Sequence, residues 1–364
     1  MNRYARQMQL PQIGADGQAR VQRGHALVIG CGALGCAAAD LLARAGVGRL
    51  TLVDRDVVEP TNLQRQCLFT EADAAAGRLK ADAAAARLGA VNSEIEIRAV
   101  ADDVHAGSLP DLLDDVDVIV DGVDNFETRY LLNDVAVADG FPYVYGGAIA
   151  THGMRMTILG RPEAARHHRS AITWTPEQAT ACLRCLFPEP PPPGATPTCE
   201  TAGVLGPVIQ TIAALQVTEV LKLLAGRLDD LRRNLLRVDV WDGTFRTITA
   251  DQPRTGCPCC GQSRFDALDH PRSAVATAMC GSATVQIHPP VTEPVIELPR
   301  LAKRLADHGS FRQADQVLRG RLDHEPGDDG RPVELLIFSN GRALVRGLAD
   351  PGRARALYAR YVGT

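Results

Sequence analysis

Short apolar runs alternate with longer helical patterns through the N-terminal part of the chain. The segments His25–Gly30, Arg49–Asp54 and Val116–Asp121 are dominated by Leu, Val and Ile, which is typical of strands buried on both faces of a parallel sheet. Between them, Ala33–Gly46 and the alanine-rich Gly77–Leu88 have helical spacing, and the first of these ends at a glycine. This alternation predicts an α/β fold, in which helices cover a mostly parallel sheet.

The pattern changes after about residue 160. A proline-rich stretch, residues 188–198, is incompatible with a helix or a central strand. The apolar periodic segment that follows, Gly203–Ala225, predicts a long helix. The segment Leu235–Thr249 predicts a β-hairpin that turns at Asp242-Gly243.

The last part of the chain predicts a separate small module. Residues 263–282 read as a linker between an N-terminal domain, residues 1–262, and an α+β domain, residues 283–364. The predicted elements of this second domain are a strand at Thr284–Ile287, a helix at Leu298–His308, a hairpin turning at Asn340-Gly341, and a helix from about Pro351 to Tyr361.

Composition and charge narrow the range of partners. The chain of 364 residues has 45% hydrophobic residues, and its formal net charge is -4. Because a nucleic-acid-binding domain is usually basic, this charge gives no reason to expect a nucleic-acid partner. The N-terminus lacks the apolar core of a signal peptide. No uncharged run approaches the roughly 20 apolar residues of a membrane helix. We therefore expect a cytoplasmic protein without a membrane partner.

A glycine-rich turn lies between the first predicted strand and helix. Gly30, Gly32 and Gly35 fit the pattern G-x-G-x-x-G, which lets phosphate groups approach backbone N–H groups at a helix N-terminus. Asp54 ends the next strand and can accept hydrogen bonds from ribose hydroxyls. The motif predicts a Rossmann-like nucleotide site, but it does not separate NAD from ATP.

Further charged residues favour a triphosphate. Arg65 and Lys80 bring two cations into the region after the second strand, which suits charge that develops on a leaving pyrophosphate. Asp124 and Asn125 follow the strand that ends at Asp121, at the sheet edge where ligands bind in such folds, and Asp124 could hold Mg²⁺. In the alternative interpretation, Arg65 and Lys80 are solvated helix residues, and for Lys80 alone this is the better reading.

Two C-x-x-C pairs predict a metal site. Cys182 with Cys185 and Cys257 with Cys260 supply four thiolates, which favours a closed structural Zn²⁺ site without catalytic function. Cys259 lies inside the second pair and is a spare thiol that could replace Cys257 or Cys260 as a ligand. Such a site would tether the C-terminal half of the N-terminal domain.

Several motifs together resemble one known family. The stretches RYARQ, GCGALG, LVDRDVVEPTNLQRQ, GRLKA and DGVDN occur in the order and spacing of the ThiF/MoeB/HesA family of ubiquitin-activating-like adenylyltransferases. The resemblance covers roughly residues 1–262. It implies ATP-dependent adenylation of the C-terminal Gly-Gly carboxylate of a ubiquitin-like, ThiS- or MoaD-like sulfur carrier protein. The products of such pathways are thiamine, molybdopterin or related compounds.

The resemblance also implies roles for individual residues. Arg6 would reach into the partner subunit of a homodimer, and Cys199 would lie on a loop over the adenylate, where it attacks the adenylate in some relatives. A cysteine desulfurase or another sulfur donor would be a further partner. Ala33 departs from the glycine that relatives often have, but it is small enough to fit. The expected nucleotide-binding residues are Gly30, Gly32, Ala33, Gly35, Asp54, Asp56, Asn62, Gln64, Arg65, Lys80, Asp124 and Asn125, with Asp124 as the Mg²⁺ ligand.

Other functions remain open from the sequence. The glycine motif and Asp54 also fit an NAD-dependent oxidoreductase, although no substrate half offers a clear catalytic acid or base. A non-catalytic partner subunit would lack the ATP residues that are present here. Adenylation of a peptide or of a tRNA-linked acid also fits the superfamily. Residues 283–364 contain no cysteine and do not resemble a sulfurtransferase domain, so carrier docking, dimer support and donor recruitment are all open for them.

Overall fold

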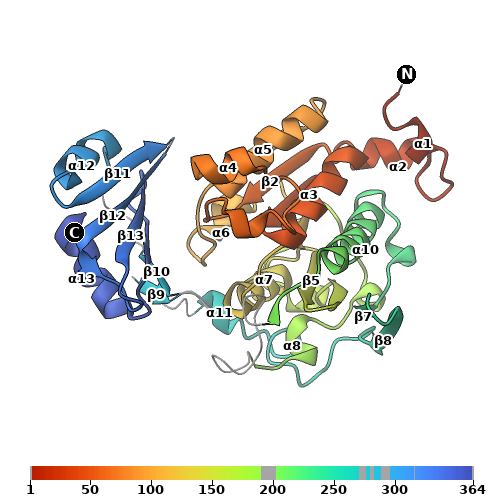
Figure 1. The fold of residues 1–364 in the computed structure, drawn as a ribbon. Helices are drawn as coiled ribbons and strands as arrows, with labels where there is room; N and C mark the ends of the chain where they lie inside the picture. The colour runs from red at the N-terminus through yellow and green to blue at the C-terminus, as the bar shows by residue number, and fades with distance from the viewer. Residues whose placement is uncertain are drawn as a thin grey trace. The chain divides into compact units, whose positions relative to one another are not determined.

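The computed structural model describes residues 2–189, 202–269, 276–278, 283–287, 296–314 and 316–362. The chain forms two compact units, Met1–Pro271 and Arg272–Thr364 (Figure 1). Each unit has its own sheet and its own hydrophobic core.

An eight-stranded sheet forms the centre of unit 1, in the order β3-β2-β1-β4-β5-β6-β7-β8. The strands β3 through β5 in this order run parallel, and β6, β7 and β8 continue the sheet antiparallel. The sheet therefore combines a parallel half of the doubly wound type with an antiparallel extension. Its strands are β1 (His25–Ile29), β2 (Arg49–Val53), β3 (Glu96–Val100), β4 (Val118–Asp121), β5 (Tyr143–Ile149), β6 (His152–Ile158), β7 (Asn234–Asp239) and β8 (Thr244–Thr249).

Helices cover both faces of the parallel half because its strands are apolar on both sides. Val28 of β1 packs in one core with α3, α5 and α10, whereas Leu27 packs in the other with α6 and α7. The predicted mostly parallel sheet with covering helices is thus confirmed. The helices of unit 1 are α1 (Ala5–Met8), α2 (Gly14–Val21), α3 (Ala33–Ala45), α4 (Glu71–Ala76), α5 (Lys80–Val91), α6 (Leu109–Leu112), α7 (Phe126–Ala138), α8 (Leu183–Leu186), α10 (Gly206–Leu224) and α11 (Asp266–Asp269). Short 3₁₀ helices lie at Pro60–Asn62, Pro162–Ala164, Pro176–Gln178 and Leu228–Asp230.

One helix boundary differs from the sequence prediction. The predicted helix Gly77–Leu88 is in fact α5, and Gly77 is the left-handed C-cap of the preceding α4, with φ of 62°. Glycine adopts this conformation without a steric penalty and so ends a helix here rather than starting one. The predicted hairpin is confirmed as β7 and β8.

The long predicted helix is confirmed as α10. By length and composition alone it could cross a membrane. In the structure it packs against α3, β5 and β6. Its Gln216 and Glu219 are buried and form hydrogen bonds with the rest of unit 1, which is the behaviour of a core helix in a folded domain.

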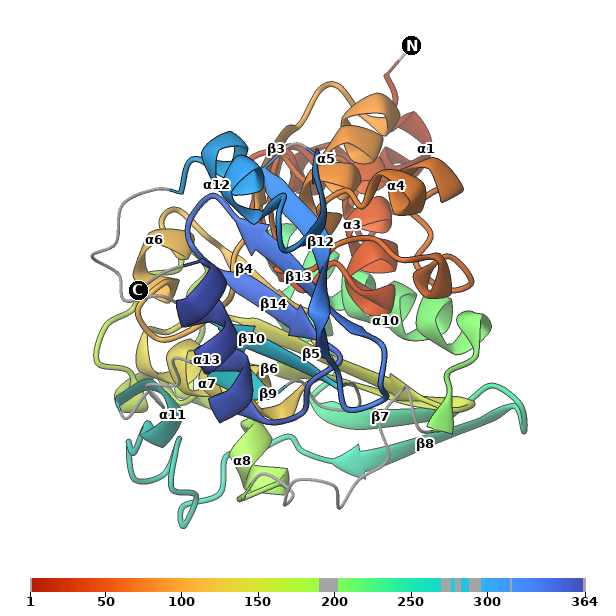
Figure 2. The ribbon, with the colours of Figure 1, turned by 60° about the vertical axis from the view of Figure 1, so that its left-hand side comes forward.

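Unit 2 is built on a six-stranded antiparallel sheet, in the order β11-β12-β13-β14-β10-β9. In this unit α12 contacts β11 and β12, and α13 contacts β10 and β9 (Figure 2). The apolar faces of both helices meet one face of the sheet in a single core. The elements are β9 (Ala276–Ala278), β10 (Thr284–Ile287), α12 (Leu298–Leu305), β11 (Gly309–Ala314), β12 (Val317–Pro326), β13 (Pro332–Phe338), β14 (Ala343–Arg346) and α13 (Pro351–Tyr361).

The sequence prediction found part of unit 2. Strand β10, the hairpin of β13 and β14, and α13 occur as predicted, and α12 ends three residues before His308. Strands β11 and β12 were not predicted, because β12 carries Arg319, Arg321 and Asp323 among its apolar positions and has no continuous apolar run. The interval predicted as a linker, residues 263–282, contains α11 and β9.

Candidate functional site: a nucleotide edge and a cysteine cluster

The glycine-rich loop makes a tight turn between β1 and α3. Gly30 has φ of 87°, a conformation that favours glycine. A Cβ atom on Gly35 would lie 1.7 Å from the carbonyl oxygen of Gly30, whereas a Cβ on Gly32 would meet nothing closer than 3.6 Å. Gly30 and Gly35 therefore shape the loop, and Gly32 leaves open space at the N-terminus of α3, where the helix dipole favours an anion.

Asp54 connects the glycine loop to the end of β2. Its carboxylate accepts hydrogen bonds from the backbone N–H of Cys31 at 2.6 Å and of Asp56 at 2.7 Å. Burial raises the pKa of Asp54, while the ammonium group of Lys80 acts in the opposite direction. The aspartate expected to hold a ribose thus also fixes the position of the loop.

Lys80 is a buried cation among carboxylates. It is only 7% exposed, so the alternative in which it is a solvated helix residue does not hold. Its Nζ lies 3.1 Å from a carboxylate oxygen of Asp56. Burial acts to lower the pKa of Lys80, but the charges of Asp56, Asp54 and Asp124 outweigh it and raise the pKa, so the side chain stays protonated. The structure therefore brings these four predicted residues together at the carboxyl edge of the sheet.

The stretch that follows β2 is held mainly by its own loop. The buried Asn62 accepts a hydrogen bond from the Glu59 N–H at 3.0 Å, and Arg65 donates to the Thr61 carbonyl oxygen at 2.8 Å. Gln64 is exposed. Of the three, Asn62 has a structural role in capping the loop, and Arg65 and Gln64 retain surface for a ligand.

A buried ion pair lies below the turn that follows β4. The carboxylate of Asp121 is fully buried and lies 3.3 Å from Nε of Arg129 on α7. The Tyr143 hydroxyl donates to the same carboxylate at 2.7 Å. Burial raises the pKa of Asp121, and Arg129 and Tyr143 act against that rise. Asp124 is exposed, and Asn125 caps α7 by accepting the Thr128 N–H at 2.8 Å.

Arg129 was not among the residues singled out from the sequence. It stands on the first turns of a helix that begins at Phe126, where an arginine is ordinarily a solvated charge. A signal did exist: Asp121 ends an apolar strand and must be neutralised if it is buried, and Arg129 is the next arginine along the chain.

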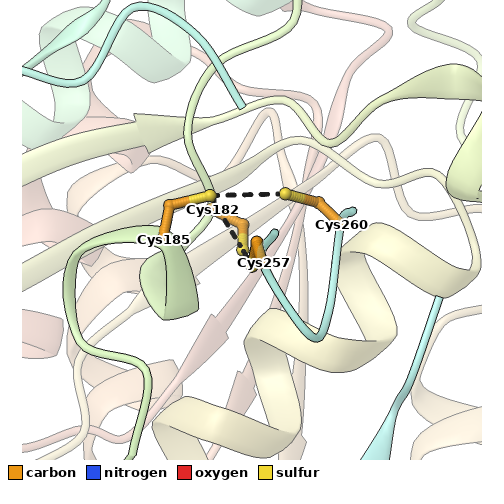
Figure 3. Close-up of side chains that lie close together, drawn as sticks. All are labelled: Cys182, Cys185, Cys257 and Cys260. Carbon is orange, nitrogen blue, oxygen red and sulfur yellow. Dashed lines mark hydrogen bonds between the residues drawn. The ribbon is translucent and has the colours of Figure 1, made fainter. Parts of the chain in front are cut away.

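Four cysteines form a cluster in the second core of unit 1 (Figure 3). The Sγ atoms of Cys182, Cys185, Cys257 and Cys260 all lie within 4.8 Å of one another, with 3.6 Å between Cys182 and Cys257 and 3.4 Å between Cys185 and Cys260. A tetrahedral Zn²⁺ site with Zn–S bonds of about 2.3 Å places its sulfurs about 3.8 Å apart. The four thiols therefore fit the predicted zinc ion.

The side chains around the cluster decide which cysteines take part. Cys259 accepts a hydrogen bond from Nδ2 of Asn133 at 3.4 Å and lies outside the cluster, which resolves the ambiguity in the second pair. Oδ1 of the same Asn133 accepts the backbone N–H of Leu183, at 2.8 Å. Hydrogen bonds from Cys182, Cys185 and Cys260 lower the pKa of Cys257. Similar contacts raise the pKa of Cys260, so a cation is needed for all four to be thiolates.

The last two predicted residues are Arg6 and Cys199. Arg6 is exposed on α1. Cys199 lies outside the described residues. The described ends of its segment are fixed to unit 1: the Tyr130 hydroxyl donates to the Phe187 carbonyl oxygen at 2.7 Å, and the Ala150 N–H donates to Gly203 at 2.9 Å.

Residues 4–259 match the family model described as "ThiF family". The chain belongs to the ThiF family. A relative in Bacillus subtilis, the sulfur carrier protein ThiS adenylyltransferase, is 36% identical over 362 residues, which are 99% of this chain and 99% of the relative. The sulfur carrier protein adenylyltransferase of Thermus thermophilus is 40% identical over 262 residues, 72% of this chain and 91% of its own.

Solved structures have the same fold. The crystal structure of E. coli MccB with ATP superposes with a TM-score of 0.57 at 21% sequence identity, and the match covers 71% of this chain and 75% of that one. The similarity to the ThiS adenylyltransferase differs in extent, because it runs through unit 2 as well as through the ThiF-family unit.

Proposed function

We propose that this chain uses ATP to adenylate the C-terminal Gly-Gly carboxylate of a ubiquitin-like sulfur carrier protein and releases pyrophosphate. The observation that carries the proposal is the placement of Lys80 at the glycine loop, where its ammonium group faces Asp54, Asp56 and Asp124. The similarity over both units to a ThiS adenylyltransferase supports it. A buried, permanently charged lysine suits a triphosphate better than the hydride transfer of a nicotinamide enzyme.

In this reaction the protein mainly positions the reactants and neutralises the charge of the phosphates. A carboxylate oxygen of the carrier attacks the α-phosphorus of ATP, a new O–P bond forms, and the bond to the pyrophosphate oxygen breaks. The N–H groups at the start of α3 and the ammonium group of Lys80 stabilise the charge on the phosphates. Arg65 would add a second cation. Bound Mg²⁺ would neutralise phosphate charge, with the exposed carboxylate of Asp124 as its protein ligand.

Pyrophosphate exchange tests the proposal directly. Purified protein is incubated with ATP, labelled pyrophosphate and, in turn, each ubiquitin-like protein of the same genome that ends in Gly-Gly. We expect exchange with one carrier and none with the same carrier shortened by its last two residues. Asp124→Ala and Arg65→Ala should abolish exchange but leave the melting temperature close to that of the wild type. Exchange at the wild-type rate in either variant would contradict the assignment, and binding of NAD in place of ATP would support an oxidoreductase instead.

The later sulfur chemistry is proposed on separate grounds. We propose that Cys199 attacks the carrier adenylate, so that a thioester forms and AMP leaves. Since residues 283–364 contain no cysteine, the sulfur itself would come from a separate donor such as a cysteine desulfurase. A carrier-dependent thioester should be trapped on the wild type and not on Cys199→Ala. Equal sulfur transfer by both proteins would exclude this role.

We also propose that the enzyme is a cytoplasmic homodimer in which Arg6 acts at the partner's nucleotide site. Its exposed position on α1 leaves it available for such a contact. Sedimentation of the purified protein at monomer mass would exclude the dimer.

A further inference from the structure

The backbone just before Asp124 is held on both sides by the buried ion pair. The Val123 N–H donates to Oδ1 of Asp121 at 3.0 Å, and the Val123 carbonyl oxygen accepts a hydrogen bond from Nη2 of Arg129 at 2.7 Å. Both polar backbone groups of this residue are therefore bound to side chains of the same pair. This restricts the backbone dihedrals that set the direction of Asp124.

Arg129 also ties this turn to the neighbouring strand. The same Nη2 donates to the Gly146 carbonyl oxygen of β5 at 3.1 Å. The guanidinium carbon lies 5.2 Å from the ring centre of Tyr145 and 5.8 Å from that of Phe126, so the cation also rests against two aromatic rings. A planar group with several fixed donors can make these contacts together, whereas a lysine ammonium is a single point charge.

Burial of this pair has a free-energy cost, and what distinguishes it from the buried Arg155–Glu219 pair is its position beside the turn that carries Asp124. Removing two charges from water is unfavourable, and an apolar pair of similar volume is often as stable. The pair is hydrogen-bonded to Val123, the residue before the exposed Asp124 that is the proposed Mg²⁺ ligand, and Asn125 on the other side caps α7. Asp124 is thus held between two fixed points while its own side chain faces solvent.

We propose that Arg129 is a positioning residue: through the Val123 carbonyl oxygen and Asp121 it holds the turn in the geometry in which Asp124 binds the metal ion of metal–ATP. The inference rests on the proposed function, since it assumes that Asp124 meets Mg²⁺ there. Because Arg129 is buried, it would act through these groups rather than on the nucleotide itself. Its effect is on the metal dependence of the site rather than on folding alone.

The test compares Arg129→Lys with a matched control, Arg155→Lys. Arg155 is also buried, lies 3.9 Å from Glu219 and donates to a carbonyl oxygen, but it belongs to β6. Binding of ATP is measured calorimetrically without carrier at a series of Mg²⁺ concentrations, and pyrophosphate exchange is measured with carrier. Loss of this alignment is expected to raise the Mg²⁺ concentration for half-maximal ATP binding by about 10- to 100-fold in Arg129→Lys, with little change in Arg155→Lys.

The measured outcomes separate the two proposals. A wild-type Mg²⁺ profile in Arg129→Lys, or an equal shift in the control, overturns the positioning role. If Arg129→Lys does not fold, the double variant Asp121→Asn/Arg129→Met removes both charges and should show the same Mg²⁺ shift in a folded protein. Wild-type protein that binds Mg²⁺ and ATP but exchanges pyrophosphate with no carrier overturns the proposed function, and the calorimetric comparison still decides the role of Arg129.

Discussion

We expect that replacing either of two glycines in the glycine-rich loop, Gly32 or Gly35, with alanine weakens ATP binding, but for different physical reasons. The Cβ of Gly35→Ala would lie 1.7 Å from the Gly30 carbonyl oxygen, and ordinary contact begins at 3.4 Å, so β1 and α3 must separate by about 1.7 Å. This contact is with backbone and cannot be relieved by a side-chain rotation. In Gly32→Ala the nearest atom is 3.6 Å away, and φ of -74° suits alanine.

The expected sizes follow from these distances. Overpacking of this kind costs about 1–3 kcal/mol, and a domain of this size loses about 2–4 °C of melting temperature per kcal/mol. Gly35→Ala should therefore melt about 2–12 °C lower than the wild type. It should also lose about 100-fold or more in ATP affinity, since a displacement near 1 Å can cost that much. Gly32→Ala should keep the wild-type melting temperature and lose ATP affinity only, because its methyl group occupies the space where phosphates approach the backbone.

Differential scanning fluorimetry and calorimetric ATP titration measure both quantities on the same samples. The decisive comparison is between the variants. If the melting temperature of Gly35→Ala equals that of the wild type, the contact with Gly30 does not constrain the loop. If Gly32→Ala binds ATP with wild-type affinity, the open space at the start of α3 is not the phosphate site.

Two further predictions concern stability and metal content. Burial lowers the pKa of His25 from its ordinary 6.5, against a hydrogen bond to the Asp115 carbonyl oxygen. Because the folded pKa is depressed, stability from this group is present above about pH 6.5 and is lost as the pH falls through the folded value, so urea titrations of His25→Gln should show a weaker pH dependence below pH 6.5. Cys260→Ser should lose bound zinc in elemental analysis, whereas Cys259→Ser should retain it; the reverse result would contradict the ligand set derived from the Sγ distances.

The sequence predicted the parts of the fold that rest on local pattern. The run His25–Gly30 has almost no polar position, which favours a buried strand, and the two C-x-x-C pairs predicted the cysteine cluster because four thiols at such spacing suit a common metal. The sequence did not predict β12. Its polar and apolar residues face different sides of the sheet, and this pattern can be interpreted only when the position of the sheet is known. The structure of such a segment depends on contacts with residues far away in the chain, which local sequence pattern does not reveal.

The burial of single charges was the least predictable feature. Lys80 and Arg129 both stand at the beginning of helices, where charged residues are ordinarily solvated, yet both are less than 10% exposed. What buries them is the meeting of helix starts with the carboxyl ends of the strands, a property of the whole sheet. The spacing of apolar residues predicts that a helix forms, but it does not predict which turn of that helix is covered by the rest of the fold.

Helix α7 links the two parts of the site in one stretch of 13 residues. Its first turns hold the Val123 carbonyl oxygen through Arg129, and one turn further on Asn133 hydrogen-bonds Leu183, which lies between the first two cysteines, and Cys259, which lies between the second two. Local opening of either region would break contacts that are made by this one helix. We therefore expect the two regions to open together, so that a metal ion bound by the four cysteines would also stabilise the turn that carries Asp124.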